Sequence, residues 1–131
     1  MNKNAKKISL GLFCTYVAAV MLLCVIKTDS LPELPKFYLG IPLDKIMHFA
    51  MFLPFPILGY MAFYPTEKGC MREFAVLGIM FLLGVGFAFA TERLQAMTDY
   101  RSYEINDMLA DLIGIATGAI IGIIIILKRR K

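Results

Sequence analysis

Four long stretches without a formal charge dominate this sequence and restrict what it can fold into. They cover residues 8–26, 46–64, 74–91 and 112–127. Each approaches or reaches the roughly 20 apolar residues that an α-helix needs to cross about 30 Å of hydrocarbon. The stretches therefore predict an all-α protein, an integral membrane four-helix bundle.

The composition leaves little of the chain for a separate soluble domain. Of the 131 residues, 59% are hydrophobic and 18% are charged, whereas a soluble domain has about 25% charged residues. Four helices, at about residues 8–26, 44–64, 74–96 and 105–127, account for nearly the whole length. We therefore expect one transmembrane domain over residues 1–131.

The distribution of charge predicts how these helices are oriented. With four spans, both termini and the loop at residues 65–73 lie on one side, which carries nine basic and two acidic residues. The opposite side carries five basic and eight acidic residues. The positive-inside rule then places both termini in the cytoplasm. Because a basic excess at helix ends serves orientation, we expect no nucleic-acid partner.

The second predicted helix contains two prolines. Pro54 and Pro56 cannot donate backbone hydrogen bonds, so the helix should be kinked there. A membrane tolerates such a kink where neighbouring helices or water satisfy the freed carbonyl groups. At the start of the same helix, Asp44 is expected to be the N-cap.

The fourth predicted helix carries a stripe of small residues. Ala110, Gly114, Gly118 and Gly122 recur at intervals of four, which places them on one face. Small residues at this spacing let helix backbones approach closely. The stripe indicates packing within a bundle, and it also permits a homo-oligomer.

Polar side chains gather at one level of three predicted helices. They are Asp44, Lys45, His48, Glu92, Gln95, Asp107 and Asp111, with Arg101 in the connecting loop. At about 100° per residue, the pairs Asp44/His48 and Glu92/Gln95 each share a helix face, and the last two aspartates share the face of the glycine stripe. The ends of the three helices that carry them lie at the outer membrane surface in the predicted topology. The sequence therefore predicts a polar site that faces into the bundle near that surface.

Each of these residues also has a purely structural explanation. Asp44 and Asp107 would cap their helices, and Lys45 would reach the interface as an anchor. Glu92 would pair with Arg93 or with Lys45. However, ionisable clusters inside membrane segments are functional hypotheses by default, and convergence from three helices favours a site.

Three motifs resemble those of the VanZ-like membrane proteins. "DKIMHFAMF" resembles their D-K-x-x-H-F-x-x-F opening, and "ERLQ" resembles their E-x-x-Q element at the end of the third helix. "RSYEINDMLADLIGIATG" resembles their closing R-x-x-x-x-x-D-x-x-A-N-x-x-G-x-x-x-G segment. The resemblance covers Pro42 to Gly122, and this chain has Asp111 where the family usually has asparagine.

The resemblance implies where such a protein acts more than what it does. The family is named for a protein associated with low-level resistance to the glycopeptide teicoplanin, which leaves the peptidoglycan precursor terminus unaltered. It implies a multi-pass protein of the bacterial cytoplasmic (inner) membrane that acts in the cell envelope. No settled activity comes with the name, so the chain is not assigned as an enzyme, and the sequence identifies no cofactor.

Two hypotheses assign functions to the polar residues. In the first, the site binds a membrane lipid headgroup, a lipid-linked precursor or a glycopeptide. Lys45 and Arg101 contact phosphate or carboxylate, and Asp107 and Glu92 hold these two cations in place. The ligand-binding set also includes Gln95 and Asp111. In the second, the protein is a small intramembrane enzyme acting on a lipid headgroup.

The enzyme hypothesis has an acid–base version and a metal version. His48 would be the general acid or base, oriented by Asp44, with Glu92 or Asp107 as the partner carboxylate. Alternatively, His48, Glu92, Asp107 and Asp111 would hold a divalent metal, although no established metal motif is present. A transport or scaffold role is a third hypothesis. Transporter sites lie near the bilayer midplane, whereas these charges lie at one end.

Overall fold

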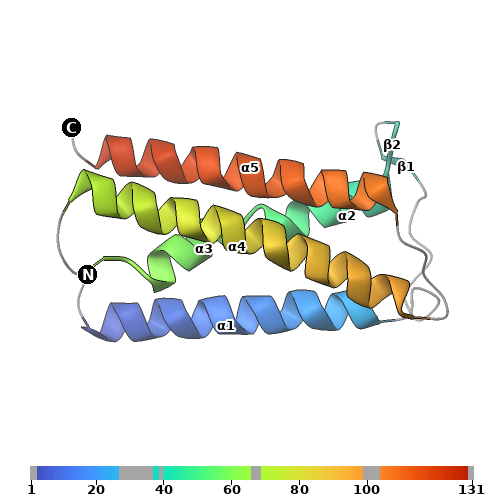
Figure 1. Ribbon diagram of the computed structural model, residues 1–131, viewed down its shortest axis with the longest axis horizontal. Helices are drawn as coiled ribbons and strands as arrows, with labels where there is room; N and C mark the ends of the chain where they lie inside the picture. Colours follow the sequence, from blue (N-terminus) through green and yellow to red (C-terminus); the bar gives the residue numbers. More distant parts are fainter. Residues whose placement is uncertain (1–2, 27–36, 39, 66–68, 99–103, 130–131) are drawn as a thin grey trace.

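The computed structural model describes residues 3–26, 37–38, 40–65, 69–98 and 104–129. Its elements in chain order are α1 (Lys3–Val25), β1 (Phe37–Tyr38), β2 (Ile41–Pro42), α2 (Leu43–Phe52), α3 (Phe55–Ala62), α4 (Cys70–Ala96) and α5 (Ile105–Lys128). Helices α1, α4 and α5 are long rods, and α2 and α3 together form the remaining span (Figure 1).

The described residues contain four helical spans long and apolar enough to cross a membrane, which confirms the predicted all-α membrane bundle. The spans are Asn4–Val25, Leu43–Ala62, Cys70–Ala96 and Ile105–Lys128. Large apolar side chains such as Leu12, Leu82 and Ile120 are more than half exposed. Apolar surface of this kind suits contact with lipid better than contact with water.

The arrangement of the spans brings three helix ends together. Helix α1 packs against α3 and α4, whereas α5 packs against α2, α3 and α4. Helix α1 begins and α5 ends at the same end of the bundle (Figure 1). At the opposite end lie the start of α2, the end of α4 and the start of α5, so their polar residues share one level.

Two helices begin earlier than the apolar stretches indicated. Helix α1 starts at Lys3 and α4 starts at Cys70. The polar residues before each apolar stretch extend the helix at its N-terminal end. They can do so because the backbone makes the helical hydrogen bonds, and polar side chains do not prevent them.

The second span is broken at its prolines, which confirms the predicted kink. Helix α2 ends at Phe52, and α3 begins at Phe55 with Pro54 as its N-cap and a proline in its first turn. Near this break, the Tyr16 hydroxyl of α1 donates a hydrogen bond to the Met51 carbonyl. A neighbouring helix thus supplies a hydrogen-bond donor to a carbonyl beside the break.

The small-residue stripe of α5 lies directly against the end of α2, as expected. A Cβ atom added at Gly114 would lie 2.5 Å from the Phe49 carbonyl oxygen, and one at Gly118 would lie even closer to the carbonyl oxygen of Leu53. Both obstacles are backbone atoms, which cannot rotate away. The absence of a side chain at these two positions therefore sets the distance between α2 and α5.

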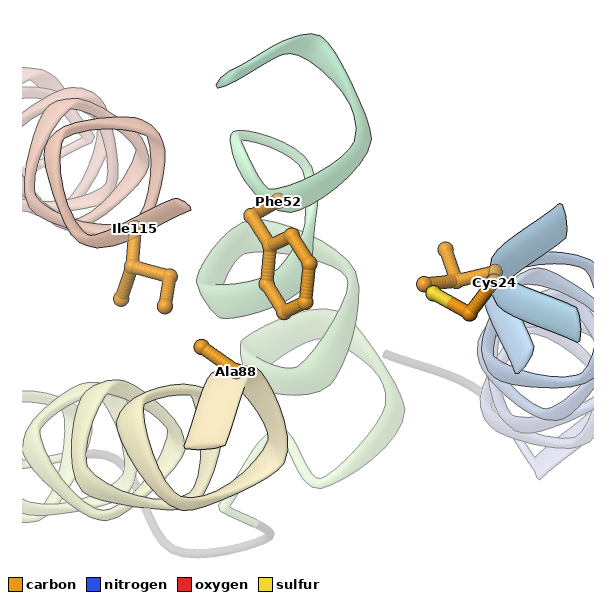
Figure 2. Close-up of a cluster of buried hydrophobic side chains, with 5 residues drawn as sticks. Cys24, Phe52, Ala88 and Ile115 are labelled. Atoms are coloured by element: carbon orange, nitrogen blue, oxygen red, sulfur yellow. The ribbon is translucent and has the colours of Figure 1, made fainter. Parts of the chain in front are cut away.

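A cluster of buried apolar side chains holds the centre of the bundle. Phe52, Ala88 and Ile115 have 0% of their surface exposed, and Val20 and Cys24 of α1 complete the cluster. These side chains come from four different spans (Figure 2). Burial of one such large side chain contributes about 1.5–3 kcal/mol relative to exposure in water, a gain that is smaller against lipid.

The start of α2 differs from the predicted one. A short antiparallel hairpin, with Phe37 paired to Pro42 and Tyr38 to Ile41, leads directly into the helix. Gly40 in its turn has a φ of 78°, a conformation that favours glycine. The N-cap is Pro42, and Asp44 lies in the first turn of the helix. The expected N-cap role of Asp44 is therefore wrong, because the hairpin starts the helix earlier.

The α2–α5 contact yields a stability prediction. Gly118→Ala should lower the free energy of unfolding by about 1–3 kcal/mol, because the new methyl group meets the Leu53 backbone. Gly86→Ala on α4 is the matched control, since nothing lies within 4 Å of its new Cβ. Denaturant unfolding in detergent micelles, followed by circular dichroism, compares the two variants. Equal stability of both would contradict the close contact.

The hydrogen bond across the break yields a second prediction. Tyr16→Phe should lower the free energy of unfolding by about 1–3 kcal/mol, because the Met51 carbonyl loses its hydroxyl donor in an apolar environment. Tyr38→Phe removes the same atom from an exposed side chain and should leave stability unchanged. The same unfolding measurement applies, and a loss of equal size in both variants would argue against a specific role for Tyr16.

Candidate functional site

A cluster of charged side chains occupies the end of the bundle where α2 and α5 begin and α4 ends. We call it the polar cluster: Lys45, His48 and the carboxylates of Asp44, Glu92, Glu104, Asp107 and Asp111. His48, Glu92 and Asp111 are buried, whereas the side chains of Asp44 and Glu104 are 51% exposed. The polar cluster thus extends from the interior of the bundle to its surface.

Lys45 is the positive centre of the exposed half of the polar cluster. Its Nζ atom lies 2.9 Å from an Asp44 oxygen and 2.7 Å from a Glu104 oxygen. It also forms an ion pair with Asp107 Oδ1. One ammonium group therefore neutralises part of the charge of three carboxylates from α2, α5 and the residue before α5.

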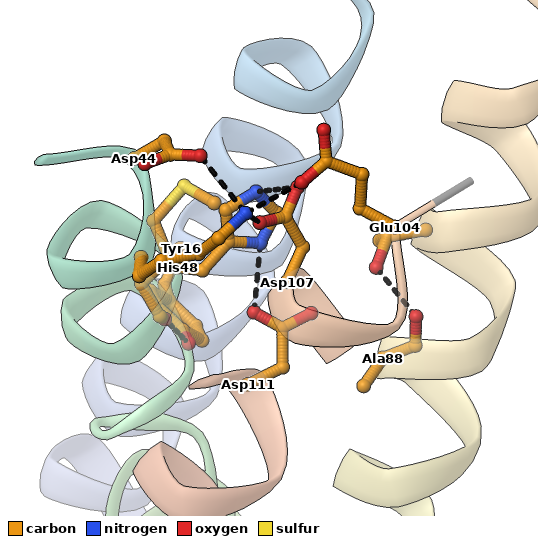
Figure 3. Close-up of polar contacts among 10 residues, drawn as sticks. Tyr16, Asp44, His48, Ala88, Glu104, Asp107 and Asp111 are labelled. Atoms are coloured by element: carbon orange, nitrogen blue, oxygen red, sulfur yellow. Dashed lines mark hydrogen bonds and ion pairs between the residues drawn. The ribbon is translucent and has the colours of Figure 1, made fainter. Parts of the chain in front are cut away.

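His48 lies between two aspartates of α5 in the buried half. Its Nδ1 atom lies 2.9 Å from Asp111 Oδ1, and its Nε2 atom lies 3.5 Å from Asp107 Oδ2. With Asp111 ionised, its carboxylate only accepts hydrogen bonds, and the Nδ1 hydrogen of His48 is donated to it. This bond orients the imidazole ring with Nε2 toward Asp107 (Figure 3).

Helix α4 contributes two buried polar residues one turn apart. Glu92 is 1% exposed and Gln95 is 3% exposed. The backbone of Glu104 hydrogen-bonds to the Glu92 carboxylate, which ties the start of α5 to the end of α4. One oxygen of Glu92, one of Asp107 and one nitrogen of His48 lie within 4.8 Å of one another.

The helix termini favour negative charge at this end. Asp44 lies in the first turn of α2 and Asp107 in the first turn of α5. The N-terminus of a helix carries a partial positive charge that stabilises nearby carboxylates by about 0.3–1 kcal/mol each. Two such termini meet here, which helps to explain why acidic residues outnumber basic ones.

The structure places the predicted site residues with one change of partner and one change of helix cap. His48, Glu92 and Asp107 come together as expected, with Asp111 beside His48. The carboxylate that orients His48 is Asp111; Asp44, expected in that role, contacts Lys45 instead. Asp107 does not cap α5, because Glu104 occupies the N-cap position. The prediction for Arg101 lies outside the described residues.

Sequence reasoning groups Glu104 with Asp107 and Asp111 if the last helix begins early enough, but it identifies no partner for Glu104. Its contact with Lys45 depends on where α5 begins, since Glu104 directly precedes the helix. Its position three residues before Asp107 was the available signal. Tyr16 was also missed, although its hydroxyl stands out in an otherwise apolar stretch.

The polar cluster combines the elements of several kinds of site. The His48–Asp111 pair has the geometry of a base held by an orienting carboxylate. Two groups of donor atoms are close enough to share a metal ion: His48, Glu92 and Asp107, and separately Asp44, Glu104 and Asp107. The second group already surrounds the ammonium of Lys45.

Comparison with known proteins places the chain in a family. A family model described as VanZ/LLP1 matches residues 13–127, most of the chain. Neither a curated protein nor a solved structure shows a match. The match begins within the first span and covers nearly all of the other three, including the three helix ends that carry the polar cluster. This multi-pass membrane protein therefore belongs to the VanZ/LLP1 family.

Proposed function

We propose that this protein binds, through its polar cluster, the headgroup of an amphipathic molecule of the bacterial cell envelope. The ligand class includes membrane lipids, lipid-linked precursors and lipophilic glycopeptides such as teicoplanin. These molecules share a charged polar group attached to an apolar anchor. The chain would act in the cytoplasmic membrane, with the polar cluster at the outer surface and both termini in the cytoplasm.

The gradient of burial within the polar cluster carries this proposal. Asp111 is fully buried, the Lys45 and Asp107 side chains are 17% and 15% exposed, and Asp44 and Glu104 are half exposed. Charges that served only to anchor helix ends would point toward water. These instead lead from the surface into the bundle, as expected for groups that receive a ligand from the membrane interface.

The charge distribution supports the outer location. Among the described residues, Lys6, Lys7 and Arg72 lie near the end opposite the polar cluster, together with Lys128 and Arg129. Basic residues at helix ends favour the cytoplasmic side. The polar cluster would therefore face the side where envelope precursors and glycopeptides are found.

Headgroup binding tests the proposal directly. Lys45→Met should weaken binding of phosphatidylglycerol roughly 10- to 100-fold. This is the effect expected from losing one charge-assisted contact to the headgroup, or from losing the lysine that holds the neighbouring carboxylates in place. The matched control is Lys128→Met, which removes the same charge from the opposite end of α5. Native mass spectrometry of the purified protein with added phosphatidylglycerol and diacylglycerol measures the retained lipid.

Two outcomes would contradict headgroup binding. One is equal retention of phosphatidylglycerol and diacylglycerol by the wild type, since diacylglycerol has the same tails without a charged headgroup. The other is an equal loss of phosphatidylglycerol in the Lys45 and Lys128 variants. Helical content and gel-filtration profile should match the wild type in both variants.

A second candidate function, hydrolysis or transfer at the headgroup, is favoured by the His48–Asp111 hydrogen bond. An imidazole whose Nδ1 is held by a carboxylate can exchange a proton at Nε2, and such a base contributes typically 10²–10⁴-fold to a rate. Nε2 faces Asp107 Oδ2 at 3.5 Å, and Glu92 is near enough to serve as the partner carboxylate.

Lipid turnover tests the enzyme. If the protein acts on headgroups, His48→Gln should reduce turnover of phosphatidylglycerol vesicles at least 100-fold, because glutamine cannot exchange a proton at this position. Lys128→Met again serves as the control and should retain full activity. Lipid products are followed by liquid chromatography and mass spectrometry. Unaltered lipids in the wild type, or equal turnover by the His48 variant, would exclude this mechanism for phosphatidylglycerol.

A further inference from the structure

The buried half of the polar cluster gathers three carboxylates around one imidazole. Glu92, Asp107 and Asp111 surround one imidazole, while Lys45 is shared with the exposed Asp44 and Glu104. Oδ2 of Asp111 is buried and has no hydrogen-bond partner among the described residues. A buried carboxylate oxygen without a partner destabilises a fixed site. A cation bound in the buried half would stabilise this oxygen.

The orientation of His48 indicates where such a cation would bind. Because Nδ1 donates to Asp111, a neutral imidazole presents the lone pair of Nε2 to Asp107 Oδ2. Two acceptors then face each other at 3.5 Å with one Glu92 oxygen nearby. A cation between these atoms converts three mutually repelling acceptors into three ligands.

From this geometry we infer that His48 Nε2, Asp107 and Glu92 bind a divalent transition-metal ion of the zinc or manganese type. Tetrahedral ligands at about 2.0–2.1 Å from such an ion lie about 3.3 Å apart. The donor atoms here lie within 4.8 Å of one another, so small side-chain rotations bring them to this separation. Imidazole combined with carboxylates matches the preference of Zn²⁺ and Mn²⁺ over Ca²⁺.

Asp111 acts in this site as a positioning residue. Metal-binding histidines commonly donate their other ring hydrogen to a carboxylate, which fixes the tautomer and makes the ring a better ligand. The 2.9 Å contact from His48 Nδ1 to Asp111 Oδ1 has this form. Asp111 places a negative charge close to the ion. The attraction between them offsets the cost of burying this carboxylate completely.

The metal ion would also complete the proposed headgroup site. Three protein ligands leave a further coordination position open, as in catalytic zinc sites. Lys45 is already bonded to three carboxylates, so an incoming phosphate would meet an acidic surface without the ion. With the ion in place, a phosphate or carboxylate oxygen of the ligand can occupy the open position. This part of the inference rests on the proposed function, whereas the metal site itself does not.

Metal content of the full-length protein in detergent tests the inference. After treatment with a chelator and incubation with Zn²⁺ or Mn²⁺, the wild type should retain one ion per chain, as measured by inductively coupled plasma mass spectrometry. Glu92→Gln and Asp107→Asn should lose this ion, because each replaces a ligand carboxylate by a neutral amide. Asp111→Asn keeps the hydrogen-bond acceptor for His48 and should weaken affinity about 10- to 100-fold.

Glu73→Gln is the matched control, since Glu73 is a buried glutamate of the same helix α4 at the end opposite the polar cluster, and the glutamine still accepts the Tyr60 hydrogen bond. It should retain the ion at wild-type affinity. Co²⁺ absorption spectra of the wild type give a readout that needs no variant: bands of a nitrogen- and oxygen-ligated ion support the site. The inference is overturned if the wild type retains neither Zn²⁺ nor Mn²⁺. It is also overturned if Glu92→Gln and Asp107→Asn, with normal helical content, bind as the wild type does.

Phosphatidylglycerol binding, measured on the same metal-loaded and metal-free preparations, separates this inference from the proposed function. Tighter lipid binding with the ion present supports both. Lipid binding by a protein that retains no ion overturns the metal site and leaves headgroup binding standing. Stoichiometric metal binding without retention of phosphatidylglycerol supports the metal site and contradicts the headgroup proposal for this lipid.

Discussion

The close packing of α5 against α2 is the contact on which both the bundle and the polar cluster depend. Gly114 lies against the backbone at Phe49, the residue after His48. Asp111 is one turn before Gly114 on α5, and aspartate has a short side chain. It can reach the imidazole only if the two helix backbones are close, and the glycine makes that approach sterically permissible.

The same contact explains why the charges can be buried at all. An isolated ionised group in a low-dielectric environment costs several kcal/mol, and this cost falls near the membrane interface. Here the acidic groups lie beside two helix N-termini, and Lys45 and His48 contact them across the α2–α5 interface. The glycine stripe, the helix ends and the charges thus support one another.

The sequence was sufficient for the fold because lipid imposes simple rules on length and polarity. The number of spans, the break at Pro54 and the packing of Gly114 and Gly118 all follow from helix geometry. The grouping of polar residues at one end also follows, since the order of the spans determines which ends meet. All of these features depend on the spacing of residues and not on side-chain conformation.

The partners within the polar cluster were less predictable. Spacing alone allowed Asp44 to orient His48, but the hairpin at Phe37–Pro42 shifts the helix start and Asp44 contacts Lys45 at the surface. Glu104 became a partner of Lys45 because it directly precedes α5, a boundary that is difficult to place to one residue. The choice between Asp44 and Asp111 required the distance between α2 and α5, which no pattern within one helix contains.

Asp107 uses its two oxygens in different directions: Oδ1 contacts Lys45 and Oδ2 faces His48. The exposed and buried halves of the polar cluster therefore share the negative charge of one carboxylate. A cation that binds at the imidazole weakens the attraction between Asp107 and Lys45. An anion that binds to Lys45 leaves Asp107 free to attract a cation at the imidazole more strongly. Thermodynamic linkage makes this influence reciprocal, so two ligands bound in the two halves would change each other's affinity by the same factor.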